Sequence, residues 1–447
     1  MPGIPSKDAS FVRETPRNYA LTKYPQLVFS IVALLFILLY WFIMVITRGN
    51  WLNTYYLNDY NDTYMDYYNM LANLYDAKHP YRFNANYPAL CFLIWRVLFH
   101  IVPFIPESAN SFFLRTYTPA TLGYILCNVF LLIYIYELLS HMISGKKITR
   151  LLLSVSIIFS GPFIFALERG NIILLSFAFT LSFCVLYNSD KKTYRILGYL
   201  CLSIAAAVKI YPALFGLLVI HKKRVRESIL AVFIGIIVFL IPFFSFEGIK
   251  SFKDFLHGIL YANSLQGDIG MGYNFSLKNL TKIFSVILGH NFTTYYPFLL
   301  IIMVCLCLAL SLLSTKEWQR SLGIILMIIW IPDFSYTYVL IFLFIPLIQF
   351  LNELQGTEIS IKNLLIGFCF LLIQIPLALP TLAQYDIFNA KFPLTYPTLI
   401  INFAIVCLAI ITYIDTLVYT LKKFCNFITS KRHAEYCSSH QKDMLHG

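Results

Sequence analysis

Long runs of apolar residues recur along the chain and set its fold class. They cover residues 27–47, 118–143 and 398–421, and a shorter run covers 298–313. A helix needs about 20 apolar residues to cross roughly 30 Å of bilayer hydrocarbon, and the three long runs meet that length. A soluble chain of 447 residues has no use for so many, so the pattern predicts an all-α integral membrane protein.

Basic residues set the orientation of the first helix. The largely polar segment 1–26 precedes it and carries Lys7, Arg13, Arg17 and Lys23. Positive charge favours the cytoplasmic side, so this segment is predicted to be a cytoplasmic tail and the first run a retained span. Residues 48–117 then form an exterior loop. Within it, the apolar stretch 90–106 contains Arg96 and is predicted to lie in the outer interface or against the bundle without crossing.

Two later apolar segments are predicted to break near their middle. Residues 196–220 have basic residues on both flanks, which places both ends in the cytoplasm. Pro212 lies inside this segment, and proline removes a backbone donor and disfavours helix at the residue before it. Residues 321–351 repeat the pattern, with a polar break at 331–338. We expect both breaks to face the exterior, because non-helical backbone in a membrane must line a cavity or be buried in protein.

The resulting count is about 12 transmembrane or re-entrant helices in one membrane domain, 27–421. Two exterior loops, 48–117 and 246–296, are predicted to carry short helices, and 151–167 is predicted to be a single span. The basic segment 422–447 is predicted to be a cytoplasmic tail. Both termini would then be cytoplasmic, in a multi-pass protein of the cell (plasma) membrane.

Composition narrows the partners. Charged residues make up 13% of the chain and apolar residues 59%, which suits lipid as the solvent. The net charge of +12 comes mostly from Lys and Arg in short loops and tails, so we expect membrane lipid and no nucleic acid as a partner. The ten cysteines include no CxxC pair, which favours free thiols over a zinc site or disulfide framework.

Two carboxylates follow the first span. Asp62 and Asp66 would lie one turn apart on one face of a helix. A carboxylate held on an exterior surface can act as general base toward a hydroxyl nucleophile, and the alternative is an ordinary solvated acidic loop. Neighbouring aromatic residues, among them Tyr67, suit either the membrane interface or stacking against a sugar.

Two cations are candidates for binding a phosphate. Lys209 lies at the first predicted break, where a lysine is costly and marks a site unless it snorkels to the interface. Arg169 lies in a short turn between two predicted spans, and Tyr211 accompanies Lys209. The other candidates for substrate contact lie in segments assigned to the same side, where a plain loop or a packed kink is the alternative: Asn171, Asn274, Ser276, Asp333 and Tyr336.

Acids, cations, amides and hydroxyls assigned to one side of the membrane suit transfer of a sugar from a lipid phosphate. An aspartate would deprotonate the acceptor hydroxyl while the anomeric carbon inverts. Lys209 or Arg169 would stabilise the departing phosphate, which is a weak base and needs no general acid.

The chain resembles the GT-C class of polyprenyl-phosphate-sugar glycosyltransferases, in the bacterial mannosyltransferase-like branch that includes the phosphatidylinositol mannoside mannosyltransferases. The resemblance rests on motifs in a fixed order: an Asp in the first exterior loop before Pro80-Tyr81 and Tyr87-Pro88, then Arg169-Gly170-Asn171, Ala207-Val208-Lys209-Ile210-Tyr211-Pro212 and Asn274-x-Ser276-Leu277. Many relatives carry a histidine in the last broken helix, where this chain has Tyr336-Thr337-Tyr338.

The resemblance implies a GT-C-like bundle and an inverting transfer of a hexose, with mannose favoured, from a polyprenyl-phosphate donor to a glycan or glycolipid acceptor on the outer face. It implies that Asp62 is the base, with Asp66 in reserve, and that no cofactor or divalent metal is required. A lipid-linked glycan polymerase or ligase is the first alternative, although its arginine-rich exterior loop is missing from 246–296. A secondary transporter is the second, and it would be expected to show inverted repeats.

Overall fold

The computed structural model describes most of the chain as helices. The described residues are 23–50, 55–56, 63–75, 80–81, 85–101, 110–222, 224–266, 270–377, 379 and 394–443. Within these ranges no strand forms, and an isolated antiparallel bridge joins Asn274 to Tyr336. The predicted all-α class is confirmed.

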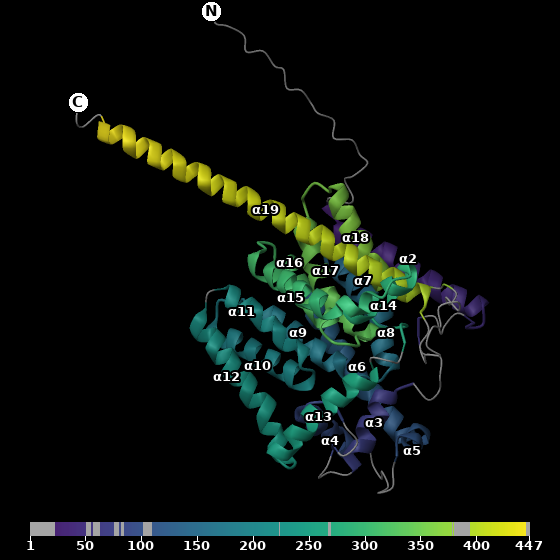
Figure 1. Cartoon of the computed structure of the whole chain (residues 1–447). Coiled ribbons are helices and arrows are strands. Elements are labelled where there is room, and N and C mark those ends of the chain that lie inside the picture. The colour runs from purple at the N-terminus through teal and green to yellow at the C-terminus, as the bar shows by residue number, and fades with distance from the viewer. Residues whose placement is uncertain are drawn as a thin grey trace, which may run out of the picture.

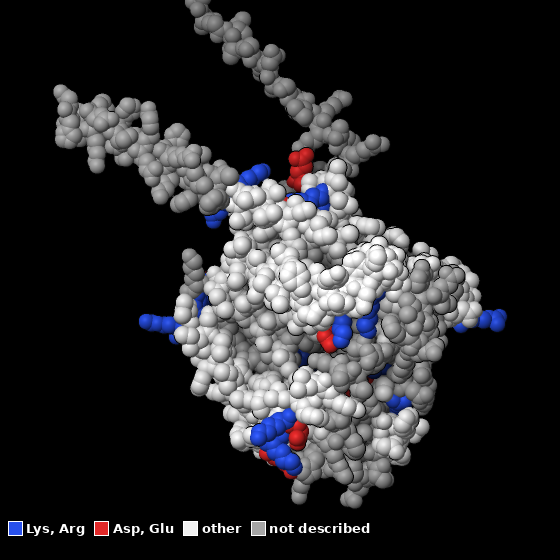
Figure 2. Space-filling model, viewed as in Figure 1, with Lys and Arg blue, Asp and Glu red and all other residues white. Residues whose placement is uncertain are grey.

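Six helical segments are long and apolar enough to cross a membrane. They are α2 (Pro25–Ile46), α6 (Thr118–Met142), α12 (Val225–Leu240) with η3 (Ile241–Ser245), η4 (Phe292–Tyr295) with α15 (Tyr296–Leu313), η5 (Thr337–Leu343) with α17 (Phe344–Leu354), and the first part of α19 (Tyr396–Asp443). Large apolar side chains are exposed on α2, α6, α12 and α15, as lipid contact requires. Charged residues are sparse on the face shown in Figure 2. The chain is a multi-pass membrane protein.

Both predicted helix breaks are confirmed. Helix α10 (Lys192–Val208) ends at Lys209, whose backbone is extended at φ −141° and ψ 127°, and η2 (Tyr211–Gly216) and α11 (Leu217–His221) follow. Helix α16 (Glu317–Trp330) ends before a non-helical segment that leads to η5 and α17. Each break contains a proline: Pro212 lies in the first turn of η2, where a missing N–H is tolerated, and Pro332 follows the end of α16 by two residues.

A third break corrects the single span predicted at 151–167. Helices α7 (Lys147–Ile158) and α8 (Gly161–Glu168) meet at an angle of 51°. Pro162 lies in the first turn of α8, a position that proline favours at the start of a helix. Gly161 is needed beside it, because a Cβ there would lie 2.1 Å from the hydroxyl of Tyr55.

The segments predicted as exterior loops form short helices that pack together. They are α3 (Met65–Tyr75), α4 (Ala89–Ile101), α5 (Ser111–Thr116), α13 (Ile249–Gln266) and α14 (Leu277–Leu288). Figure 1 shows α3, α4, α5 and α13 gathered at the end of the molecule opposite α18. A core that includes Tyr67, Phe92, Leu114 and Phe255 joins these four helices.

The broken helix α16–η5–α17 lies at the centre of the main core, where nearly every side chain is buried. Around it pack α9 (Ile173–Leu186), α18 (Ile361–Gln374) and α19. Helix α19 continues to Asp443, through much of the segment predicted as a tail.

Candidate active site

A cavity of about 830 Å³ lies where the two predicted breaks approach α3. Its walls come from α3, the segment 85–88, the α10–η2 break and the α16–η5 break. Residues that the sequence singled out line it together: Asp66, Arg169, Lys209, Tyr211, Asp333 and Tyr336. Segments far apart in the sequence thus meet around one polar space.

Lys209 lines this cavity and has no ion-pair partner among the described residues. Its ammonium nitrogen lies 4.1 Å from the ring centre of Tyr87 and 5.8 Å from that of Tyr338. In the described part of the chain it forms no salt bridge. Aromatic faces attract a cation but do not neutralise it, so the charge is available to an anionic group.

Asp66 is held at the start of α3 by the turn that follows α8. Arg169 donates to one carboxylate oxygen at 3.0 Å, and Asn171 donates to the other at 2.5 Å. The Asp66 backbone N–H also donates to the Arg169 carbonyl at 3.0 Å. The carboxylate side chain is 18% exposed, toward the cavity that it lines. Both oxygens are therefore oriented while one edge stays accessible.

Gly170 makes this clamp possible. Its φ of +66° lies in the left-handed region, which disfavours residues with a side chain. A Cβ at this position would lie 2.9 Å from the Cβ of Tyr67 and 3.0 Å from the Cα of Tyr64. The turn can approach α3 this closely only with glycine.

Tyr87 lies between the two charged groups. Its hydroxyl is 3.4 Å from the Asn171 amide nitrogen, and its ring faces Lys209. Burial, reinforced by the Asp66 carboxylate, raises the pKa of Tyr87 well above its ordinary value. Its hydroxyl therefore stays protonated and can donate a hydrogen bond into the cavity.

The opposite wall is fixed by a second set of contacts. The Asp333 carboxylate accepts from Lys278 Nζ at 2.9 Å and from the Tyr296 hydroxyl at 2.9 Å. Asn274 accepts from the backbone N–H of Ser335 at 3.0 Å, and Ser276 donates to the Asp333 carbonyl at 2.8 Å. These bonds tie the segment before α14 to the break. Asn274 and Ser276 therefore shape the wall from behind.

Two further predicted residues, Tyr67 and Asn171, are absent from the cavity lining, and a third lies outside the described residues. Asp62 lies outside the described residues. Tyr67 is 1% exposed and donates to the Ala120 carbonyl at 2.7 Å, within the core beneath α3. Asn171 acts on Asp66 from behind, because it is buried and bonded to that carboxylate.

Sequence reasoning missed part of the lining. Asn69 and Asn73 lie three and seven residues after Asp66, so they share its helix face, and this spacing could have revealed them. It also missed Lys278, two residues after Ser276, which is not part of the lining but bonds the lining residue Asp333; nothing in the sequence pairs these two residues. Tyr338 was noted only as a departure from relatives.

An apolar groove of about 800 Å³ continues from the cavity. It runs between α10, η2–α11 and α12, and it shares Ile210, Ala213 and Leu214 with the cavity. Its lining is apolar except for Tyr199, Ser203 and Ser228. A molecule with a polar head and a hydrocarbon chain could occupy both spaces at once.

Comparison with known proteins gives one match. The sequence matches the model of glycosyltransferase family 87 over residues 98–331, slightly more than half of the chain. The match includes Arg169, Lys209 and Asn274. No curated protein and no solved structure matches. The chain therefore belongs to glycosyltransferase family 87, a GT-C-like family, and is a membrane-bound glycosyltransferase.

Proposed function

We propose that this glycosyltransferase moves a hexose, with mannose favoured, from a polyprenyl-phosphate donor to a hydroxyl of a glycan or glycolipid acceptor, on the exterior face of the plasma membrane. The observation that carries the proposal is that a cation-lined polar cavity and an apolar groove adjoin each other and share three lining residues. A donor with a phosphate between a sugar and an isoprenoid chain has the same succession of polar and apolar parts.

The donor phosphate would lie beside Lys209. This ammonium forms no salt bridge among the described residues, and Lys209 lines the cavity next in sequence to Ile210, which lines both the cavity and the groove. Arg169 lies on the same cavity but already bonds Asp66, so it would contribute a second, shared charge. The isoprenoid chain would then follow the groove between α10 and α12.

We propose Asp66 as the general base. Two acids line the cavity within the described residues, and each carboxylate has two bonding partners, Arg169 and Asn171 for Asp66 and Lys278 and Tyr296 for Asp333. We choose Asp66 because its carboxylate acts electrostatically on Lys209, beside which the donor phosphate would lie. Asp66 would accept the proton of the acceptor hydroxyl as that oxygen bonds to the anomeric carbon. The bond from this carbon to the phosphate oxygen breaks on the opposite face, which inverts the centre and releases polyprenyl phosphate.

Positioned cations give this reaction its charge stabilisation. Lys209 and Arg169 would hold the phosphate as negative charge develops on the leaving oxygen, which is where fixed charges in a water-poor site act most strongly. On this scheme no metal or cofactor is required. A transfer assay run with and without a metal chelator tests that part, and loss of activity on chelation would contradict it.

The decisive experiment uses the purified full-length protein in lipid vesicles with a panel of polyprenyl-phosphate sugars. We expect one donor, polyprenyl-phosphate mannose first, to be consumed with release of free polyprenyl phosphate and glycosylation of an added glycan or glycolipid. Consumption of a nucleotide sugar and of none of the lipid-linked donors would overturn the proposal.

A further inference from the structure

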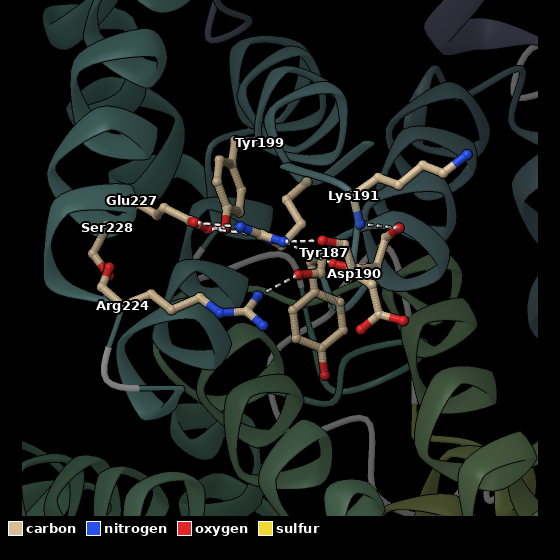
Figure 3. Close-up of polar contacts among 9 residues, drawn as sticks. Tyr187, Asp190, Lys191, Tyr199, Arg224, Glu227 and Ser228 are labelled. Atoms are coloured by element: carbon tan, nitrogen blue, oxygen red, sulfur yellow. Dashed lines mark hydrogen bonds and ion pairs between the residues drawn. The ribbon is translucent and has the colours of Figure 1, made fainter. Parts of the chain in front are cut away.

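A compact polar cluster closes the groove at the end remote from the cavity. Figure 3 shows its centre, where the side chains of Glu227 and Tyr199 meet. Arg195 donates to the two Glu227 oxygens at 2.9 Å and 2.6 Å, and the Tyr199 hydroxyl donates to one of them at 2.6 Å. Arg195 also donates to the carbonyls of Ser189 and Asp190, at 3.0 Å and 2.9 Å.

This cluster joins two walls of the groove. Arg195 and Tyr199 belong to α10, and Glu227 lies in the first turn of α12. None of the described α12 residues is fully buried, and the helix packs on α10 and the cores through half-buried residues such as Ala231, Ile234 and Phe239. Ser228, next to Glu227, and Tyr199 both line the groove.

The ion pair in this cluster can fix the position of α12 relative to α10. The side chains of Arg195 and Glu227 are 13% and 17% exposed, so the pair is partly shielded from water. A two-pronged bond between guanidinium and carboxylate fixes both distance and direction. Removing one partner would leave the other charge partly buried and without its ion-pair partner, which is strongly destabilising.

The groove is long enough for its two ends to contact different parts of a long ligand. Groove-lining residues on α12 extend from Ser228 to Leu240, which at 1.5 Å per residue is about 18 Å. A chain that enters beside Ile210 first passes the Leu240 end of α12 and reaches the cluster only if it is long.

We propose that Arg195, Tyr199 and Glu227 are positioning residues that hold α12 as a wall for the far part of a long hydrocarbon chain, so that the groove discriminates ligands by chain length. The inference rests on the proposed function in one respect, the entry of the lipid chain into the groove from the cavity.

Binding of two isoprenoid phosphates to the purified full-length protein tests it, with geranyl phosphate as the short probe and undecaprenyl phosphate as the long one. We expect Glu227→Gln to weaken undecaprenyl phosphate binding about tenfold, equivalent to about 1.4 kcal/mol, and to change geranyl phosphate binding less than about twofold. The milder Tyr199→Phe should show the same pattern with a smaller change. The double variant R195E/E227R exchanges the two charges and restores the ion pair, so it should recover the affinity for undecaprenyl phosphate.

A matched control is Glu353→Gln, which breaks the Lys316–Glu353 pair of 2.5 Å between α16 and α17, outside the groove lining. This variant should bind geranyl phosphate and undecaprenyl phosphate as tightly as the unaltered protein does. Equal weakening of both probes by Glu227→Gln, or no change in either, would overturn the inference. If the unaltered protein bound both probes equally, the inference would also fail, while sugar transfer itself could still proceed. If it bound neither, the proposed function would fall as well.

Discussion

At the scale of single residues, the proposed base and the proposed phosphate-binding cation line one cavity, and each has different neighbours. The Asp66 carboxylate is oriented by Arg169 and Asn171, whereas Lys209 meets two aromatic rings and no carboxylate within salt-bridge distance in the described chain. The first arrangement suits a group that must point at a proton. The second suits a group that must accept an anion.

Replacing Asp66 with Asn should abolish the base and keep the shape of the site. We expect Asp66→Asn to lower the rate of sugar transfer by about 100-fold or more, the range that general base catalysis supplies. Binding of polyprenyl phosphate should not weaken, because the substitution removes a negative charge near Lys209. The parallel variant Asp62→Asn decides between the two acids: if it alone abolished transfer, the base would be Asp62.

Lys209→Ala tests the phosphate site. A hydrogen bond to a charged group contributes about 1.5–3 kcal/mol, so the affinity for polyprenyl phosphate should fall about tenfold or more. The exposed Lys146, between α6 and α7, provides the control, because Lys146→Ala removes the same charge far along the chain from the cavity lining. Unchanged affinity in Lys209→Ala would move the phosphate toward Arg169.

At the scale of helices, the sequence predicts a break where two signals coincide: basic residues on both flanks of an apolar segment and a proline inside it. Residues 196–220 carry basic flanks on both sides and Pro212 inside, and the chain does bend there. The α7–α8 break was missed because Gly161 and Pro162 interrupt an apolar run with no such change in the flanking charge. The bonds of Asp333 to Lys278 and Tyr296 depend on tertiary packing across dozens of residues, which periodicity does not encode.

The turn that carries Arg169 and Asn171 gives a test at this scale. Gly170→Ala should destabilise the protein and reduce transfer, because it combines a left-handed backbone, costing about 1–2 kcal/mol for a residue with a Cβ, with a clash against α3. Gly289→Ala has a nearly equal φ of +68° and no atom within 4 Å of its Cβ, so it pays only the backbone cost. Thermal unfolding of both purified variants should show the larger loss for Gly170→Ala. Equal losses of thermal stability would mean that the added Cβ at residue 170 does not clash with α3.

At the scale of the whole molecule, the direction of the protein in the membrane decides which pool of donor the cavity meets. The positive-inside rule places the α6–α7 loop in the cytoplasm and the segment between α14 and α15 outside. The site residues Asn274 and Ser276 lie just before α14, so the side on which this segment lies is also the side of the cavity.

Cysteine labelling in intact cells tests this orientation. In a background with the native cysteines replaced, a cysteine in place of the exposed Asn291 should react with a membrane-impermeant maleimide, whereas one in place of the exposed Lys146 should react only after permeabilisation. The reverse pattern would place the cavity in the cytoplasm, where soluble sugar donors are in reach and a lipid-linked donor has no advantage. It would leave the cavity, the groove and the family intact, but it would remove the reason for choosing a polyprenyl-phosphate sugar over a nucleotide sugar.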